Sequence, residues 1–496
     1  MLPACATPPT RPPSNEERTA TWLEEHRERP PMLRMFLQEM PKGGDLHTHL
    51  TGAVYAESYI AWAAEEGLCA DPGTSTITTC CAPTCPTRPV ADALKDGVFY
   101  RTLVDGLSMR NLSERPQSGH NHFFEVFGRF NAATTTRGPE MVAELTTRAA
   151  DEHVMYLEIM ETLRGSQVRQ LGSRVAFDKK DLAGSHQRLI DAGLPALVPE
   201  GMRDLDTIER RVAVLLGCVG NEPPAPCRVT RRYLQQTTRT AEPAVVFAQL
   251  TYAFELAQKD PRVVGLSLVA PEDDRVALRD YRLHMQMIEW LNGQYPGVNV
   301  TLHAGELALG LVPPADLRFH IRDAVLVAKA KRIGHGVAIA YEADAAQLLQ
   351  KMRERDVAVE ICLTSNDIIL GVKGTRHPFP AYLRAGVPAV LATDDEGVSR
   401  SDLTNEYVRA AETYRLGYRE LKQLSRNSLT YSFLPGQSLW LRPEGRELVP
   451  DCAGQAAQPS PTCQAFLDAS EKARMQWQLE RAFEAFEATA SGSDRQ

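Results

Sequence analysis

Two histidines separated by a single residue, His47 and His49, are the first residues in the chain whose spacing could hold a metal ion. They fall within residues 45–52, a short run typical of a buried strand followed by a turn. Alternate side chains of a strand share a face, so both imidazoles would point the same way. Because an isolated pair of this kind is more often incidental than ligating, further ligands must come from elsewhere in the chain.

Other candidate residues stand at the ends of later apolar runs. His303 ends one run and is followed by Glu306, His335 ends a second, and Asp394 and Asp395 end a third. Histidines that only satisfy a hydrogen bond in a core could fall anywhere, so this clustering indicates a joint site. Three imidazoles and one carboxylate suit zinc with room for water, although iron, cobalt and manganese accept the same ligands. A metal ion there would lower the pKa of bound water from ~15.7 to about 7, which makes it a nucleophile.

The fold must bring these run ends together. Strand-like apolar runs alternate with helical patterns, for example at residues 243–258, 278–292 and 343–355, which predicts an α/β fold with a closed (β/α)8 TIM barrel. Such barrels carry their chemistry at the carboxyl ends of the strands. An open doubly wound sheet is the alternative, but no Gly-rich phosphate loop follows a first strand. The eight runs cover residues 45–49, 154–159, 228–234, 263–269, 298–303, 332–334, 357–362 and 389–393.

The barrel is expected to carry additions at both ends and one insertion after its first strand. The Pro-rich residues 1–14 are expected to be mobile and residues 15–40 helical. The insertion is rich in Gly, Pro, Thr and Cys and is expected to have little regular core. The predicted division is an N-terminal extension at 1–40, the barrel at 41–435 with the insertion at 62–115, and a C-terminal extension at 436–496 that ends in a helix over 464–488.

Composition excludes several classes of function. The chain has 55 Lys and Arg against 63 Asp and Glu, a net charge of -8, and no dense basic run, so we expect no nucleic-acid partner. No apolar stretch approaches the ~20 residues that a membrane span needs. With 43% hydrophobic and 24% charged residues, the chain has the composition of a globular protein with a large core.

The ten cysteines indicate the compartment. Most lie in loop-like segments and close to one another, which predicts local disulfides and therefore a periplasmic or secreted protein whose export signal was removed or trimmed. Leu2 to Cys5 resembles the end of a lipoprotein cleavage box, so Cys5 is a candidate lipid anchor. The alternative is a cytoplasmic protein with free thiols. Cys362 is expected to be a buried thiol. The clusters are Cys80, Cys81 and Cys85; Cys218 and Cys227; and Cys452 and Cys463.

Five motifs resemble the adenosine and AMP deaminase family: PKGGDLHTHLTGAVY, HAGE, RIGHG, EICLTSN and TDDEG. They stand in the family's order between residues 40 and 435. The Cys-bearing insertion and NSLTYSFLPG, residues 427–436, are most similar to the secreted growth-factor-related branch and its bacterial relatives. The resemblance implies zinc-dependent hydrolytic deamination of adenosine or 2′-deoxyadenosine to inosine or 2′-deoxyinosine, with release of ammonia.

The resemblance also implies roles for the candidate residues. One Zn²⁺ per chain would be held by His47, His49, His303 and Asp394. The implied catalytic residues are Glu306, which would donate a proton to purine N1, His335, which would orient or deprotonate the attacking water, and Asp395, which would hold N7.

The substrate pocket departs from the family pattern in two places. Gly52 is retained, but Thr51 replaces a carboxylate that would contact the ribose 5′-hydroxyl. Where the family commonly reads AGDE, this chain has Ala270-Pro271-Glu272, so the backbone amide expected to meet purine N3 would come from Ala270. Both departures leave ribose recognition open.

An apolar helix is expected to cover the nucleoside through Phe123, Phe124 and Phe127, although such a stripe is as typical of an ordinary core. The partner implied is a small purine nucleoside. The alternatives are another adenine derivative, such as adenine or a thio-substituted adenosine, and a growth-factor-like binding protein on the same barrel. The charged N-terminal helix is a candidate element for a homodimer.

Overall fold

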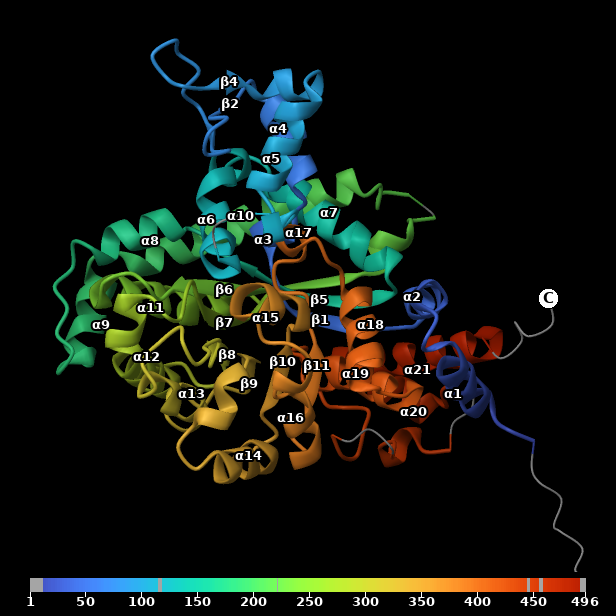
Figure 1. Cartoon of the computed structure of the whole chain (residues 1–496). Helices are drawn as coiled ribbons and strands as arrows, with labels where there is room; N and C mark the ends of the chain where they lie inside the picture. Colours follow the sequence, from blue (N-terminus) through green and yellow to red (C-terminus); the bar gives the residue numbers. More distant parts are fainter. Residues whose placement is uncertain (1–11, 115–117, 221, 444–446, 455–457, 491–496) are drawn as a thin grey trace, which may run out of the picture.

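A ring of parallel strands forms the centre of the molecule, seen in the computed structural model in Figure 1. The structure describes residues 12–114, 118–220, 222–443, 447–454 and 458–490. The eight-stranded sheet runs in the order β1-β5-β6-β7-β8-β9-β10-β11. Its strands are β1 (Gly43–His49), β5 (Val154–Glu161), β6 (Thr230–Thr238), β7 (Val263–Val269), β8 (Asn299–Ala304), β9 (Arg332–His335), β10 (Ala358–Ile361) and β11 (Ala389–Leu391).

Two backbone hydrogen bonds close the ring. The amide of Asp394, just beyond β11, donates to the carbonyl of His47 at 2.8 Å, and the amide of His49 donates to the carbonyl of Asp394 at 3.2 Å. The same contacts place three candidate ligands side by side. The eight predicted runs and the predicted TIM barrel are therefore confirmed.

Helices alternate with the strands along the chain, as parallel connections require. Strand β7 reads VVGLSLV and is buried along most of its length, because helices cover the outside of the sheet while side chains fill its interior. From α7 onward, the helices of the barrel are α7 (Gly138–Asp151), α8 (Gly165–Gly172), α9 (Leu182–Asp191), α10 (Leu194–Leu215), α11 (Pro243–Lys259), α12 (Arg275–Gln294), α13 (His320–Leu326), α14 (Ala345–Glu354), α15 (Leu363–Leu370), α16 (Phe379–Ala385), α17 (Glu396–Ser399), α18 (Leu403–Tyr414) and α19 (Tyr418–Thr430).

The insertion after β1 is more regular than the sequence predicted. It contains the end of α4 (Ala56–Glu65), an antiparallel sheet of β2 (Cys69–Ala70), β3 (Ile77–Thr78) and β4 (Arg88–Pro89), and α5 (Gly97–Gly106). The helix α3 (Leu50–Ala53) precedes it and α6 (Gly119–Thr134) follows it. Phe99, Leu103 and Val104 are buried in it. The expectation of little regular core was wrong, because apolar residues at helical spacing and local disulfides order a segment whose Gly, Pro and Thr content is typical of loops. Figure 1 shows it rising from the end of the barrel beside α6.

The two ends of the chain pack together on the side of the barrel near α19 (Figure 1). The predicted N-terminal helix is two helices, α1 (Asn15–His26) and α2 (Pro30–Glu39), since Pro30 begins a new helix. The predicted C-terminal helix is also two, α20 (Pro461–Ala469) and α21 (Glu471–Ala490). The predicted mobility of residues 1–14 falls mostly, and the candidate anchor Cys5 entirely, outside the described residues.

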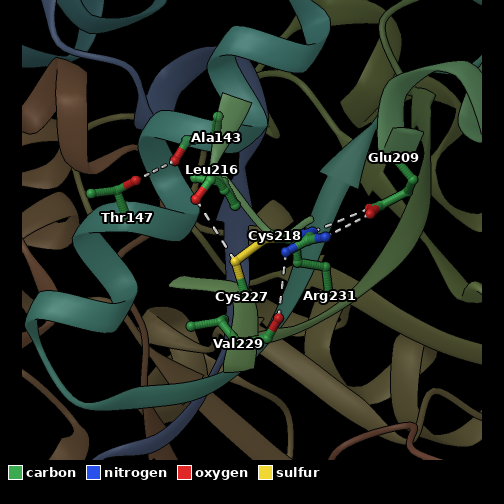
Figure 2. The surroundings of a disulfide bond; sticks show 8 residues. All are labelled: Ala143, Thr147, Glu209, Leu216, Cys218, Cys227, Val229 and Arg231. Carbon is green, nitrogen blue, oxygen red and sulfur yellow. Dashed lines mark hydrogen bonds and ion pairs between the residues drawn. A yellow bond between two sulfur atoms is a disulfide. The ribbon is translucent and has the colours of Figure 1, made fainter. Parts of the chain in front are cut away.

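Four disulfides join cysteines that are close in sequence: Cys69–Cys81, Cys80–Cys85, Cys218–Cys227 and Cys452–Cys463. The prediction of local disulfides is confirmed, although Cys81 pairs with Cys69 outside its own cluster. Figure 2 shows the Cys218–Cys227 bond tying the end of α10 to the approach of β6. The predicted buried thiol, Cys362, is free.

The Cys452–Cys463 disulfide should contribute measurably to stability, because it closes a short loop within the C-terminal extension over a sequence separation of 11. Replacing both cysteines with alanine should lower the free energy of unfolding in urea by about 2–3 kcal/mol, the loop-closure entropy that the bond removes from the unfolded chain. As a control, the same variant should lose less stability than the unaltered protein when reductant is added. Equal stability of the two proteins without reductant would contradict the prediction.

None of the helices in the described parts of the chain is both long and apolar enough to cross a membrane.

Candidate metal centre and active site

The candidate ligands converge at the carboxyl ends of three strands. One ligand atom from each of His47, His49, His303 and Asp394 lies within 4.8 Å of all the others, and all four residues are buried. Oδ1 of Asp394 lies 3.4 Å from Nε2 of His47 and 3.3 Å from Nε2 of His49. The Nε2 atoms of His49 and His303 are 3.1 Å apart. Residues from both ends of a 348-residue span of sequence thus form one compact donor set.

The hydrogen bonds around these rings fit a cation. Nδ1 of His47 lies 2.6 Å from a carboxylate oxygen of Glu360, and Nδ1 of His49 lies 2.8 Å from Oε1 of Gln236. Each Nδ1 therefore carries the proton, which leaves the Nε2 lone pair pointing into the centre. Nε2 of His47 is buried without a hydrogen-bond partner. Lone pairs that face one another repel unless a positive ion lies between them, so the donor set suits a metal ion.

The carboxylates around the centre also favour a bound cation. Burial by itself lowers the pKa of His47, but the neighbouring carboxylates of Asp394 and Glu360 outweigh burial and raise that pKa to about 10. The second oxygen of Asp394 accepts a hydrogen bond of 2.6 Å from the hydroxyl of Ser365, which fixes the carboxylate. Two buried carboxylates thus draw positive charge into the space between the rings.

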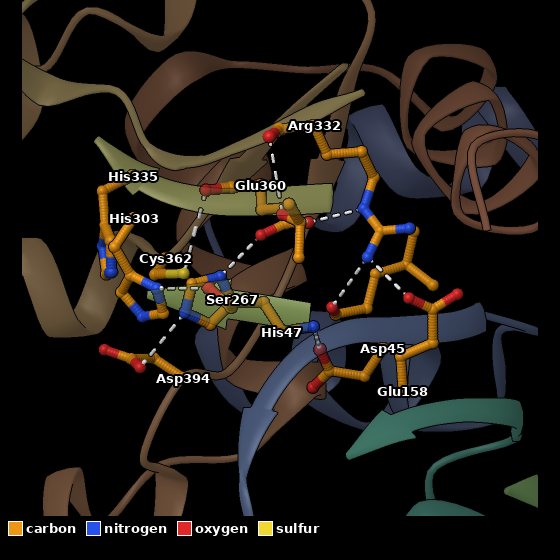
Figure 3. Close-up of polar contacts among 12 residues, drawn as sticks. Asp45, His47, Glu158, Ser267, His303, Arg332, His335, Glu360, Cys362 and Asp394 are labelled. Carbon is orange, nitrogen blue, oxygen red and sulfur yellow. Dashed lines mark hydrogen bonds and ion pairs between the residues drawn. The ribbon is translucent and has the colours of Figure 1, made fainter. Parts of the chain in front are cut away.

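Glu360, which the sequence interpretation missed, supports the centre through its contact with His47 (Figure 3). Besides His47, its carboxylate accepts from the hydroxyl of Thr301 at 2.8 Å and from Nε of Arg332 at 2.5 Å. The guanidinium of Arg332 also donates to Glu158 at 2.5 Å. These neighbours lower the pKa of Glu360 to about 2 against the opposing effect of burial. A charged residue inside an apolar strand was the available signal, because such residues are almost never buried without a partner.

Replacing Glu360 with glutamine should weaken zinc binding by about 10–100-fold, since this partner orients His47 and keeps its proton on Nδ1. Competition with a chromophoric chelator measures the affinity directly. Glu342 is a buried glutamate that hydrogen-bonds the backbone of Ile321, away from the centre, so Glu342→Gln is the matched control and should bind zinc normally. Unchanged zinc affinity in Glu360→Gln would show that His47 needs no such support.

Glu306 lies beside the centre on a backbone held in place by another glutamate. The carboxylate of Glu272 accepts from the amides of Gly305 at 3.0 Å and Glu306 at 2.7 Å, and His320 donates to it at 2.6 Å. Burial raises the pKa of the Glu306 carboxyl well above its usual range, and the charge of Asp394 raises it further. The side chain is therefore suited to stay protonated and to donate a hydrogen bond.

A chain of hydrogen bonds sets the tautomer of His335. The amide of Phe379 donates to Nδ1 of His377, so Nε2 of His377 carries a proton and donates to Oδ1 of Asn366 at 3.0 Å. Nδ2 of Asn366 then donates to Nδ1 of His335 at 2.9 Å. Burial lowers the pKa of His335 to about 3, so its ring is neutral and its proton stands on Nε2, 3.7 Å from a carboxylate oxygen of Glu306. In this tautomer His335 is a donor toward the site.

Asp395 approaches the backbone closely at Gly52. A Cβ atom at Gly52 would lie only 1.5 Å from Oδ1 of Asp395, so any side chain there would displace this carboxyl group. That oxygen is buried without a hydrogen-bond partner. Burial raises the pKa of Asp395 well above its usual range, and the adjacent Asp394 adds to the effect. Gly52 therefore serves the site by leaving room for Asp395.

A cavity of about 450 Å³ opens from the metal centre, a size that suits a nucleoside. Phe123, Phe124 and Phe127 of α6 form an apolar wall, and Thr51 and Ala270 lie on other sides. Ala270 has a φ of +78°, and His335 and Asp394 are also left-handed, at +66° and +60°. Such backbone in residues other than glycine is costly and is concentrated at functional sites.

The structure brings most of the predicted site residues into this one cavity. His49, His303, Glu306, His335, Asp394 and Asp395 line it together with the three phenylalanines, Thr51 and Ala270. His47 lies behind them in the centre, and Gly52 lies against Asp395. The sequence interpretation missed Gln236 and Thr162 on the cavity wall and Ser267, whose hydroxyl lies 3.1 Å from Nδ1 of His303.

Comparison with known proteins finds partial matches to adenosine deaminases. The family profile described as adenosine deaminase matches residues 202–439. The adenosine deaminase of Enterococcus faecalis is 37% identical over 138 residues, which cover 28% of this chain and 37% of that enzyme. The adenosine deaminase of Mycobacterium sp. (strain KMS) is 29% identical over 297 residues, 57% of this chain and 76% of that enzyme. The match to the first of these relatives thus spans little more than a third of its length.

The fold has a structural counterpart in an amidohydrolase from Burkholderia ambifaria whose crystal structure contains zinc. The two superpose with a TM-score of 0.53 at 19% identity, over 92% of this chain and 94% of that one, which is a likeness of fold. The profile match, the partial matches to bacterial adenosine deaminases and the His-His-His-Asp donor set together make this chain similar to adenosine deaminases over part of its length.

Proposed function

We propose that the protein is a zinc-dependent hydrolytic deaminase that converts adenosine or 2′-deoxyadenosine to the corresponding inosine and ammonia. One observation carries the proposal: His47, His49, His303 and Asp394 converge beside a buried Glu306 carboxyl, in a cavity that suits a nucleoside. The relatives named adenosine deaminase support the substrate, and the zinc in the related fold supports the metal.

When bound, the ion would supply an activated water as the nucleophile. The protonated carboxyl of Glu306 would donate to purine N1, where electron density gathers as C6 is attacked. The Nε2 proton of His335 would hold the water in line with C6, so the tautomer favours its orienting role over its role as a base. Asp395, protonated in its buried position, would donate to N7, and the amide of Ala270 would face N3.

The direct test is turnover by the full chain loaded with one zinc ion. Incubation with adenosine should release ammonia in equal amount to the nucleoside consumed, and the ultraviolet absorbance should shift from that of adenosine to that of inosine. Absence of turnover with all adenine nucleosides, in protein with verified zinc content, would rule out the proposal. Removing the metal with a chelator should abolish the activity, and adding zinc back should restore it.

The disulfides support a periplasmic or secreted location, because bonds of this kind persist in oxidising compartments. The Cys-bearing insertion supports kinship with the secreted growth-factor-related branch. A comparison of the protein's disulfide content when it is expressed with and without an export signal tests the location.

A further inference from the structure

The part of the cavity away from the purine-facing residues is neutral and polar. Its polar lining side chains are Thr51, Asn131, Thr162, Gln236 and Thr238. The carboxylates that line the cavity all belong to the metal centre or the catalytic group, namely Glu306, Asp394 and Asp395. Among the described residues that line it, none is a lysine or an arginine. If Glu306 and Asp395 contact the base, the sugar must lie against the neutral side chains.

The orientation of Gln236 is fixed by the metal ligand that it supports. Because Nδ1 of His49 carries a proton, Gln236 must turn its oxygen toward His49, at 2.8 Å. Its amide nitrogen then donates one hydrogen to Oγ1 of Thr162 at 3.2 Å and keeps a second hydrogen. Since Thr162 Oγ1 accepts that bond, its own hydrogen is available to donate. This wall therefore offers hydrogen-bond donors to the sugar.

Thr51 lies on α3 directly after the metal-binding strand, and its side chain is half-buried in the cavity wall. The hydroxyl of Tyr59 donates to the Thr51 carbonyl at 2.6 Å, which fixes the backbone at this point. Where the family resemblance leads one to expect a carboxylate, this chain has a neutral hydroxyl that can donate or accept. A hydroxyl left without a substrate partner costs far less than a buried carboxylate left without one.

We infer that the sugar end of this cavity binds through neutral donors and does not require a 5′-hydroxyl. Adenine nucleosides that lack this group, including 5′-deoxy and 5′-thioether forms, are then substrates comparable to adenosine. The inference rests on the proposed function. A site that hydrogen-bonds a substrate hydroxyl through a buried polar group rejects the analogue lacking it by about 10⁴–10⁵-fold, and here no such acceptor carboxylate is provided. A 5′-phosphate is disfavoured because the described residues that line the cavity include no lysine or arginine to neutralise it.

The first experiment compares three substrates with the zinc-loaded full chain. The kcat/KM for 5′-deoxyadenosine should lie within about 10-fold of that for adenosine, whereas that for AMP should be at least about 100-fold lower. Turnover of adenosine with 5′-deoxyadenosine slower by more than about 100-fold would overturn the inference and leave the proposed function intact. Failure to deaminate any adenine nucleoside would instead remove the proposed function and the inference with it.

Two variants at one position sharpen the test. Thr51→Asp introduces the missing carboxylate and should raise the preference for adenosine over 5′-deoxyadenosine by about 100-fold. Thr51→Val is the matched control, with the same shape but no hydroxyl, and should leave that preference within about 3-fold of the unaltered protein. If Thr51→Val lost turnover of adenosine but kept turnover of 5′-deoxyadenosine, Thr51 would be shown to hold the 5′-hydroxyl. If Thr51→Asp left the preference between the two substrates unaltered, Thr51 would be shown not to lie at the sugar end. Either result overturns the inference, and zinc content and melting temperature verify folding.

Discussion

Replacing His303 with alanine is expected to reduce bound zinc from one ion per chain to less than about 0.1 and to lower adenosine turnover by about 10⁴-fold or more. His303 faces the centre of the donor set, with Nε2 3.1 Å from that of His49 and its ring centroid 4.4 Å from that of His47. Without His303, three of the four candidate ligands remain, and the donor set no longer surrounds the position of the ion. Metal analysis of the purified protein, together with kcat/KM for adenosine, measures both effects.

A buried histidine elsewhere provides the control for this substitution. His284 on α12 is fully buried, and neither of its ring nitrogens has a hydrogen-bond partner in the structure. Burial lowers its pKa to about 4, so it is neutral like a ligand but lies outside the donor set. His284→Gln should keep one zinc per chain and normal turnover. Stoichiometric zinc and full activity in His303→Ala would contradict the ligand assignment.

The barrel was predictable because strands buried on both faces appear as apolar runs. Residues 263–269 illustrate this, since the predicted run and the observed β7 coincide. For β6 the prediction began at residue 228 and ended at 234, whereas the strand continues to Thr238. Its last residues are Gln235, Gln236, Thr237 and Thr238, whose polarity hid the strand. Two of these polar residues serve the site, because Gln236 contacts His49 and both Gln236 and Thr238 line the cavity.

Residues that act through contacts with distant parts of the chain could not be identified from the sequence. Glu360 meets His47 across 313 positions of sequence, and no local pattern identifies that partnership. The candidate ligands could be named because strand ends in a barrel converge whatever their spacing in sequence. The insertion was misjudged for a related reason, since its order depends on Cys69 pairing with Cys81 and on the packing of α5. Tertiary contacts there override a composition typical of loops.

Replacing Glu306 with glutamine is expected to lower kcat for adenosine by about 10²–10⁴-fold while zinc content remains at one per chain. Glutamine keeps the size of the side chain, and the Glu272 carboxylate continues to hold the backbone at Gly305 and residue 306. What is lost is the proton that the carboxyl would give to purine N1. An amide can donate a hydrogen bond there but cannot transfer the proton, so catalysis should fall much more than binding, with KM changing by less than about 5-fold.

The pH dependence distinguishes this role from a structural one. Burial and the charge of Asp394 raise the pKa of Glu306, so the protonated form persists well above the range in which an exposed glutamate ionises. The protonated form is the active one, and activity is therefore present below this raised pKa and lost as the pH rises through it. Glutamine does not titrate, so the alkaline limb that belongs to Glu306 should vanish from the kcat/KM profile of the variant.

If the limb persisted unchanged, or if the variant kept more than about a third of kcat, another group would have to be the proton donor. Asp395 would be the next to test, because burial raises its pKa as well and it lines the same cavity.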